Sequence, residues 1–244
     1  MTQNKISIMG ITDIRKKGTG TKEIHSNVVL IWSGVRKEQR AEHGVGFIIH
    51  PDNAKEILNT DFISERLIKI SIREGKKTTS YIQVYAPCND SYSDEEKDSF
   101  FEQLSDLISS IPDEEDLYVV GDFNGRVGER KTPWTKYLGP HSDNRTPSNH
   151  VLELCGEHDL FITNTFQHRA SQMYTWYRWN NIKVSSQIDF ILARSRMQIT
   201  ITDSRAIPNA GLDTDHRPIA TTLTTKKERK PKKRQQERPN MHKL

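Results

Sequence analysis

The residues best placed to do chemistry follow a short apolar run at positions 116–120. Asp122 and Asn124 come directly after Gly121, in the stretch Val-Val-Gly-Asp-Phe-Asn-Gly. On a strand this spacing directs both side chains to the same side, and α/β folds expose functional groups at strand ends. A carboxylate there can orient or deprotonate a water molecule, and a carboxamide can hold an oxyanion or a phosphate oxygen. The pair therefore predicts a hydrolytic site.

A second set of polar residues lies late in the chain. Asp189 interrupts the apolar run at 187–192, and buried acids are rare without a partner. Asp215 and His216 precede Pro218 and a further predicted strand. A histidine whose second ring nitrogen is held by a carboxylate is the usual arrangement of a general base or an electrostatic clamp. We therefore expect Asp189 to hold His216.

Two more candidates end predicted strands early in the chain. Asp13 closes the first strand, where its carboxylate could bind a hard divalent cation, and Tyr85 presents a phenol that could hydrogen-bond a phosphoryl oxygen. Taken singly, each candidate also has an ordinary explanation. Asp-His pairs are common at turns, Asp189 could cap a backbone group, and Tyr85 could simply pack. The ordered combination is what favours a functional interpretation.

Two helices are predicted among the elements that must position these side chains. Residues 91–111 carry a capping box, Ser93 with Glu96, and an apolar stripe that ends at a proline. A second helix is predicted around residues 151–155, capped by Ser148 or Asn149. Residues 53–58 are predicted to form one or two helical turns.

The remaining elements are predicted to be strands and loops. The polar segments 16–26 and 125–149 are predicted as loops. Strands are expected at 5–10, 28–32, 44–50, 66–72, 80–86, 116–120, 160–163, 175–179, 187–193, 199–203 and 218–223. Many strands with two interspersed helices predict an α/β fold of two packed mixed β-sheets flanked by helices.

The charge of the chain is concentrated at its end. The net charge is +4, but residues 226–244 hold nine Lys or Arg and two Glu, which leaves 27 basic against 30 acidic residues before them. We therefore expect one domain over residues 1–225 and a disordered basic tail over 226–244. No stretch reaches the roughly 20 apolar residues that a membrane span needs, and two cysteines, Cys88 and Cys155, favour a reducing compartment.

In this order, the motifs resemble those of the endonuclease/exonuclease/phosphatase superfamily. The sequence between these motifs is similar to that of one branch, the endonuclease domains of non-LTR retrotransposons and the craniofacial development protein 2-like proteins. The resemblance spans residues 5–223. It rests on Asp13-Ile14-Arg15, Val84-Tyr85-Ala86-Pro87, Gly121-Asp122-Phe123-Asn124, Thr175-Trp176, the run from Gln187 to Leu192, and Asp215-His216.

The resemblance implies a four-layered α/β sandwich and a Mg²⁺-dependent phosphoesterase, with Mn²⁺ as an alternative metal. Asp122 would orient the attacking water and Asn124 would stabilise the transition state. His216, held by Asp189, would contact the scissile phosphate. Tyr85 would hydrogen-bond that phosphate, and Asp13 and Asp215 would lie at the metal.

Two departures from the family pattern bear on activity. A first strand ending in Trp-Asn or a similar pair has no counterpart in this sequence, so we expect the fold to lack that strand. The metal-binding acid is usually Glu in this family and here is Asp13, one methylene shorter. Because Mg²⁺ demands near-ideal octahedral geometry, both departures predict impaired activity.

The leading functional hypothesis is a monomeric, metal-dependent DNA endonuclease of retroelement type, with no membrane partner. One alternative is a catalytically weak or inactive remnant that acts as a nucleic-acid-binding module. Another is a phosphatase of the same fold for inositol phosphates or lipids, because specificity in this fold depends on loops. The basic run at 230–234 predicts a nuclear location.

Overall fold

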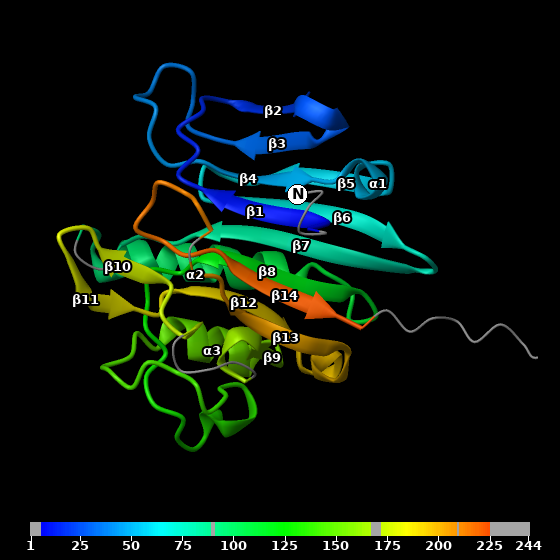
Figure 1. Ribbon diagram of the computed structural model, residues 1–244. Helices are drawn as coiled ribbons and strands as arrows, with labels where there is room; N and C mark the ends of the chain where they lie inside the picture. Colours follow the sequence, from blue (N-terminus) through cyan, green and yellow to red (C-terminus); the bar gives the residue numbers. More distant parts are fainter. Residues whose placement is uncertain (1–5, 89–90, 167–171, 209, 225–244) are drawn as a thin grey trace, which may run out of the picture.

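The computed structural model describes residues 6–88, 91–166, 172–208 and 210–224 (Figure 1). The predicted tail at 226–244 lies outside these residues, so its disorder stays a prediction. No helix in the described part is long and apolar enough to cross a membrane.

A six-stranded mixed sheet forms the centre of the molecule. The strands β7 and β8 run parallel and all other neighbours run antiparallel. In spatial order the strands are β5 (Ile57–Phe62), β6 (Leu67–Glu74), β7 (Lys77–Tyr85), β8 (Asp116–Asp122), β12 (Asp189–Arg194) and β9 (Leu160–Ile162).

A second layer of strands covers one face of this sheet, in two separate antiparallel pieces. One piece is β1 (Ile8–Thr12), β4 (Val45–Ile49), β3 (Val29–Ser33) and β2 (Thr19–Glu23), in that order. The other is β13 (Ile201–Ala206) with β14 (Ile219–Leu223). Figure 1 shows β1 and β14 in front of the central sheet. Within the described residues, each of these two strands pairs on one side only. A hairpin, β10 (Trp176–Arg178) with β11 (Asn181–Ser186), projects at the side.

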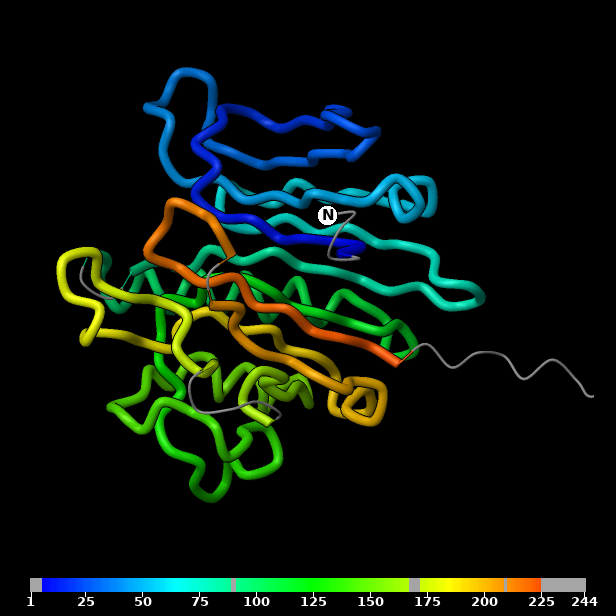
Figure 2. The backbone as a smooth tube through the Cα atoms, viewed as in Figure 1, coloured from blue at the N-terminus to red at the C-terminus, as the bar shows by residue number. Residues whose placement is uncertain are grey.

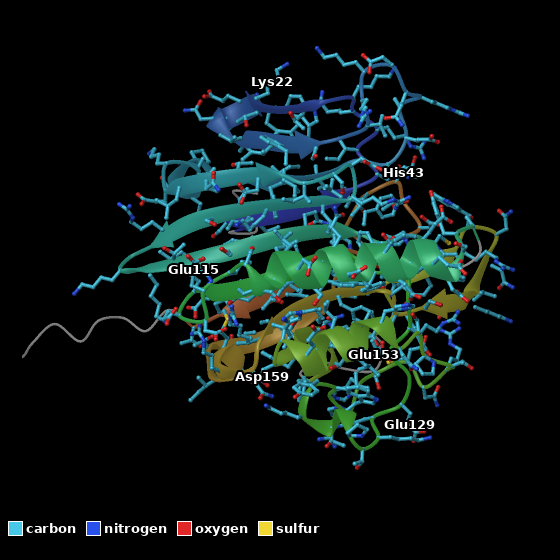
Figure 3. The ribbon with its side chains drawn as sticks, turned by 180° about the vertical axis from the view of Figure 1, so that it is seen from behind. Lys22, His43, Glu115, Glu129, Glu153 and Asp159 are labelled. Carbon is cyan, nitrogen blue, oxygen red and sulfur yellow. The ribbon has the colours of Figure 1, made fainter. Side chains whose placement is uncertain are left out.

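Two helices cover the opposite face of the central sheet, as Figure 3 shows from behind. They are α2 (Asp94–Ser109) and α3 (His150–Glu157). The short helices are α1 (Pro51–Ala54) and the 3₁₀ turns η1 (His25–Asn27), η2 (Trp134–Lys136), η3 (Thr163–Thr165) and η5 (Ser195–Thr200). The predicted α/β sandwich of two sheets flanked by helices is thus confirmed.

The central sheet is apolar on both faces because it lies between two cores. Leu67, Val84 and Val119 pack with Phe100 and Leu104 beneath the helices. On the other face, residues such as Ile68, Ile70, Phe47 and Ile49 fill the space between the strand layers. Burial on both faces makes the central sheet a rigid support for whatever its strand ends carry.

Local predictions had mixed outcomes. The capping box of Ser93 and Glu96 at the start of α2 is confirmed. At α3, Asn149 is the N-cap but makes no side-chain cap bond. The predicted loop at 16–26 is wrong because it contains β2, and the helical turns predicted at 53–58 are wrong because α1 ends at Ala54 and β5 begins at Ile57.

Candidate active site

Three predicted site residues lie in one row across adjacent strands of the central sheet. Tyr85 on β7 and Asp189 on β12 are both register partners of Asp122 on β8. Residues in register on neighbouring strands share a face of the sheet. The three residues therefore lie at the same end of the sheet, where β7 and β8 end and β12 begins.

The turn after β8 depends on unusual backbone angles. Gly121 has a φ of 144°, and a Cβ at this position would lie 2.0 Å from the carbonyl oxygen of Val84. Only glycine therefore lets β8 pair closely with β7 just before Asp122. Asn124 has a φ of 47°, which is uncommon for a residue other than glycine. Such strained positions cluster at functional sites.

Asn124 is fixed at both its backbone and its side chain. Its backbone N–H donates to Asp122 Oδ1 at 2.9 Å, and its Nδ2 donates to the carbonyl oxygen of Ala86 at 2.9 Å. These bonds tie the turn after β8 to the end of β7.

Asp189 holds His216, as the sequence predicted. The Nδ1 atom of the imidazole lies 3.1 Å and 3.0 Å from the two carboxylate oxygens of Asp189. Ligand atoms of Asp122, Asp189 and His216 all lie within 4.8 Å of one another. Thus residues from β8, β12 and the segment before β14 meet in one acidic cluster with a single imidazole.

The cluster shifts the proton affinities of its members. Burial and the neighbouring charge of Asp189 raise the pKa of Asp122 to about 8, although His216 opposes the rise. Burial would lower the pKa of His216, but the hydrogen bond and charge of Asp189, with the charges of Asp122 and Asp215, raise it to about 9. The imidazole is therefore a cation at neutral pH, and the buried Asp122 lacks enough positive charge around it to ionise easily.

Tyr85 is held by residues that the sequence reading did not single out. Arg66 Nη1 donates to the Tyr85 carbonyl oxygen at 3.0 Å, and its guanidinium lies 5.3 Å from the Tyr85 ring centroid. Arg66 Nη2 also donates to Tyr92 Oη at 2.7 Å and lies 3.3 Å from His43 Nε2. Burial, together with Asp13 and Asp122, raises the pKa of Tyr85 to about 12. The phenol is therefore a neutral donor at physiological pH.

Asp215 is adjacent to the cluster and is oriented by a tryptophan. Trp176 Nε1 donates to Asp215 Oδ2 at 2.9 Å. The charge of Asp215 raises the pKa values of both Asp122 and His216, which places it within electrostatic reach of both.

Asp13 lies at a neighbouring cavity rather than in the cluster itself. The cavity has a volume of about 310 Å³, and Asp13, Arg15, Arg40, Ala41, Glu42, His43 and Tyr85 line it. Arg15 Nε and Nη2 contact the Asp13 carboxylate at 3.1 Å and 2.8 Å. In Figure 3, His43 marks this edge of the molecule, beside the segment before β14. A cation that binds Asp13 would have to compete with Arg15.

The donors around the cluster suit a hard divalent cation. Asp13, Asp122 and Asp215 offer carboxylate oxygens, which Mg²⁺ prefers. Burial, and after it the neighbouring charge of Asp189, raises the pKa of Asp122, and a cation nearby would favour the ionised carboxylate. The residues present therefore fit a metal such as Mg²⁺, and the sequence assignment of Asp13 and Asp215 as its ligands stays a prediction.

Two buried residues support Asp189 through its backbone. Thr175 Oγ1 accepts the backbone N–H of Asp189 at 3.1 Å. Asn164 Nδ2 donates to the Asp189 carbonyl oxygen at 3.2 Å. Thr175 was expected from the sequence only as part of a motif, and Asn164 was not among the predicted residues. Asn164 is buried in the folded protein, and nothing in the sequence around it pointed to this role.

Comparison of the sequence with known proteins gives distant relatives. No family model matches. The chain is 29% identical over 220 residues to craniofacial development protein 2 of Bos taurus, covering 89% of this chain and 36% of that protein. It is 31% identical over 145 residues to the transposon TX1 uncharacterized 149 kDa protein of Xenopus laevis, covering 58% of this chain and 10% of that protein. The chain thus spans about a third of the bovine relative's length.

Solved structures share the fold at low sequence identity. A Neisseria 3′-phosphatase bound to a product DNA hairpin has a TM-score of 0.65 and 16% identity, with 92% of this chain and 91% of that chain covered. The endonuclease domain of TRAS1, a telomere-specific non-LTR retrotransposon, has a TM-score of 0.61 and 16% identity, with 93% and 90% covered. An endonuclease/exonuclease/phosphatase family protein from Leptotrichia buccalis has a TM-score of 0.59 and 14% identity, with 91% and 89% covered. The chain therefore has the fold of the endonuclease/exonuclease/phosphatase superfamily and resembles its retrotransposon endonucleases and craniofacial development protein 2.

Proposed function

We propose that this chain is a metal-dependent phosphodiesterase that hydrolyses DNA, of the retroelement endonuclease type. One observation carries the proposal: ligand atoms of Asp122, Asp189 and His216 lie within 4.8 Å of one another. Asp122 and Asp189 lie at the ends of two paired strands, and His216 lies in the segment before β14. Hydrolysis of a phosphodiester requires a positioned water, charge stabilisation and a cation. This cluster offers residues for each task.

Asp122 and Asn124 are proposed to act on the attacking water and on the developing charge. The Asp122 carboxylate is fixed by the Asn124 backbone N–H, so it can orient a water molecule without reorganising. The Asn124 amide is held by the Ala86 carbonyl oxygen and can stabilise the transition state. Groups fixed in advance cost no reorganisation at the moment of reaction.

His216 and Tyr85 are proposed to contact the scissile phosphate. With a pKa of about 9, the His216 imidazole is a cation at neutral pH, and Asp189 orients it through Nδ1. Its second nitrogen is the atom that would donate to a phosphate oxygen. Tyr85, with a pKa of about 12, keeps its phenolic proton and can donate beside it.

Asp13 and Asp215 are proposed to hold Mg²⁺, for which Mn²⁺ can substitute. Such a cation supplies positive charge against the carboxylates and the phosphate oxygens. Arg15 forms an ion pair with the Asp13 carboxylate in this structure, so a metal ion held by Asp13 would have to displace it.

DNA is the proposed substrate because of the proteins that the chain is similar to. One structural neighbour is described with a product DNA hairpin and another as a retrotransposon endonuclease domain. The basic tail predicted at 226–244 adds nonspecific affinity for phosphates and a nuclear localisation signal. We further propose that the chain acts as a monomer.

Nicking of supercoiled plasmid in the presence of Mg²⁺ tests the proposal. Wild type should nick, and His216→Ala and Asp122→Ala should each lower the rate by about 10²–10³. The exposed residues His25 and Asp52 provide the matched controls His25→Ala and Asp52→Ala, which should nick at the wild-type rate. Wild-type protein without nicking activity, or equal rates in all variants, would contradict the proposal.

A second candidate function is a nucleic-acid-binding module with weak or no activity. The ion pair of Asp13 with Arg15 favours it, because this pair neutralises a carboxylate that the metal needs. In that case the plasmid would be bound but not nicked. Hydrolysis of an inositol phosphate or lipid phosphate without nicking would instead identify a phosphatase of the same fold.

A further inference from the structure

Two arginines and two tyrosines form a continuous strip beside the acidic cluster. The Arg217 guanidinium carbon lies 3.9 Å from the centroid of the Tyr177 ring, and that of Arg145 lies 5.8 Å from the Tyr174 centroid. The two tyrosine rings meet edge to face, with centroids 6.5 Å apart. We call Arg145, Tyr174, Tyr177 and Arg217 the Arg–Tyr strip.

Backbone contacts attach this strip to the cluster. Arg217 directly follows His216, and its N–H donates to the Thr175 carbonyl oxygen. The N–H of Tyr177 donates to the Asp215 carbonyl oxygen at 2.9 Å, and Trp176 forms an isolated β-bridge with His216. Figure 2 shows the β10–β11 hairpin and the segment before β14 at the same edge of the molecule. A ligand bound at His216 therefore lies next to the strip.

The strip and its surroundings carry an excess of positive charge. Arg217 forms no ion pair with a carboxylate in the described part of the chain. Arg126 and Arg145 share a single acid, the buried Asp143, whose side chain is 1% exposed. Arg126 also donates to Ser186 Oγ at 3.0 Å, at the end of β11. Arg145 donates to both oxygens of the Asp143 carboxylate through Nε and Nη2, so Arg217 is the member of the strip whose guanidinium has no carboxylate partner among the described residues.

The geometry of the strip selects phosphate rather than bases as its ligand. Arg217 is stacked on Tyr177, so that ring is unavailable to a nucleobase on the stacked face. The tyrosine instead holds the guanidinium in place, through its ring and through a side-chain hydrogen bond with Arg217. A planar, oriented guanidinium binds phosphate oxygens in a bidentate way, and stacking on an aromatic ring reduces the entropy lost on binding.

We propose that the Arg–Tyr strip binds phosphates of the nucleic-acid strand that flank the phosphate being cleaved, with Arg217 making the nearest contact. This inference rests on the proposed function and makes it more specific. A small ester with one phosphate, placed at His216, has no second phosphate for the strip to bind. The strip therefore assigns the site to a polynucleotide strand rather than to an inositol or lipid phosphate.

Equilibrium binding of a fluorescently labelled duplex oligonucleotide, measured by anisotropy over a salt series, tests the assignment. Arg217→Ala should weaken binding by about tenfold and reduce the slope of log affinity against log salt by about one. Arg217→Lys should keep the salt slope, because it keeps the charge, but bind more weakly than wild type because it lacks the stacked fork. The control Arg73→Ala removes an exposed arginine on β6 toward the hairpin end, opposite the Tyr85 end of the sheet, and should bind as wild type does.

Cleavage kinetics add a second readout. Arg217→Ala should raise KM for an oligonucleotide more than it lowers kcat, and the rise in KM should be smaller for a diester with a single phosphate. If Arg217→Ala has the same affinity and salt slope as Arg73→Ala, the strip does not bind phosphates. If the alanine variant does not fold, Arg217→Lys replaces it, and an affinity equal to that of Arg73→Ala would likewise contradict the proposal. Weakened binding by Arg217→Ala in a protein that never cleaves DNA would leave the strip assigned and overturn the proposed hydrolysis instead.

Discussion

At the scale of single residues, the position of Tyr85 depends on Arg66. This guanidinium bonds the Tyr85 carbonyl oxygen and the Tyr92 hydroxyl and lies over both rings, at 5.3 Å and 4.9 Å. Arg66 makes no contact of its own with the acidic cluster among its hydrogen bonds in the described residues. It is therefore a positioning residue for the phenol.

Arg66→Met should lower kcat/KM by about tenfold, the worth of one hydrogen bond to a charged group. Tyr85→Phe should have a similar effect because it removes the donor itself. In the double variant the two losses should not add, because both act through the phenol. Additive losses, measured as kcat/KM for an oligonucleotide, would show that Arg66 acts elsewhere. Lys69→Met, which removes a cation on the same strand, is the matched control.

A second prediction concerns the competition between Arg15 and the metal for Asp13. Arg15→Gln removes the competing guanidinium and should lower the Mg²⁺ concentration needed for half-maximal nicking. Asp13→Ala should raise that concentration, because a carboxylate ligand is lost. The measurement is the nicking rate over a Mg²⁺ series. An unchanged half-maximal concentration in both variants would remove Asp13 from the proposed metal site.

Residue types that act through their own side-chain chemistry could be predicted from the sequence. Asp122 follows a strand-like run, Asp189 lies within one and His216 precedes one, and the structure brings the three together as expected. Arg66 and Asn164 could not be predicted in this way, because they act by bonding backbone carbonyl groups. Their partners are distant in the sequence and become neighbours only when the sheet forms.

At the scale of elements, helices α2 and α3 are joined by a histidine. His158, at the end of α3, lies with its Nε2 atom 2.7 Å from Ser105 Oγ on α2. Burial lowers the pKa of His158 below its usual value of 6.5, although the charge of Glu157 opposes the shift, and the charge of Arg194 adds to it. The neutral imidazole is thus the form that the folded protein stabilises.

The free energy of unfolding should therefore fall as the pH drops below about 6.5, because the unfolded chain then binds the proton more tightly than the folded one. His158→Gln cannot be protonated and should flatten this part of the pH dependence. Urea unfolding at a series of pH values measures how the free energy of unfolding depends on pH, and His25→Gln, at an exposed histidine, is the control. An equal pH dependence in wild type and His158→Gln would show that this histidine does not contribute.

Elements with a strong pattern were predicted better than those without one. The helix α2 has an apolar stripe and a capping box, and the strand β6 alternates, so both were expected near their observed positions. The strand β2, Thr-Gly-Thr-Lys-Glu, has no apolar residue and was expected to be a loop. It is a strand because β3 offers it a free edge, and such pairing is a tertiary effect that overrides local propensity.

At the scale of the whole molecule, the fold class follows from local sequence pattern, whereas other features depend on segments that are distant in the sequence. The fold class could be predicted because strand-like runs and two helices alternate along the chain. The division of the outer strand layer into two pieces could not be predicted from local pattern, since β1 and β14 lie at opposite ends of the sequence. The Arg–Tyr strip is likewise assembled from separated segments and gives positive charge to one edge of a slightly acidic body.

Incubation of the wild-type protein with Mg²⁺ and a duplex oligonucleotide in oxygen-18 water tests the proposed hydrolysis most directly. If Asp122 directs a water molecule onto the phosphate held at His216, the terminal phosphate of the cleaved product should carry the label. Asp122→Asn should lower the labelled yield by about 10²–10³. Absence of cleavage by wild type, an unlabelled product phosphate, or an undiminished yield from Asp122→Asn would contradict it.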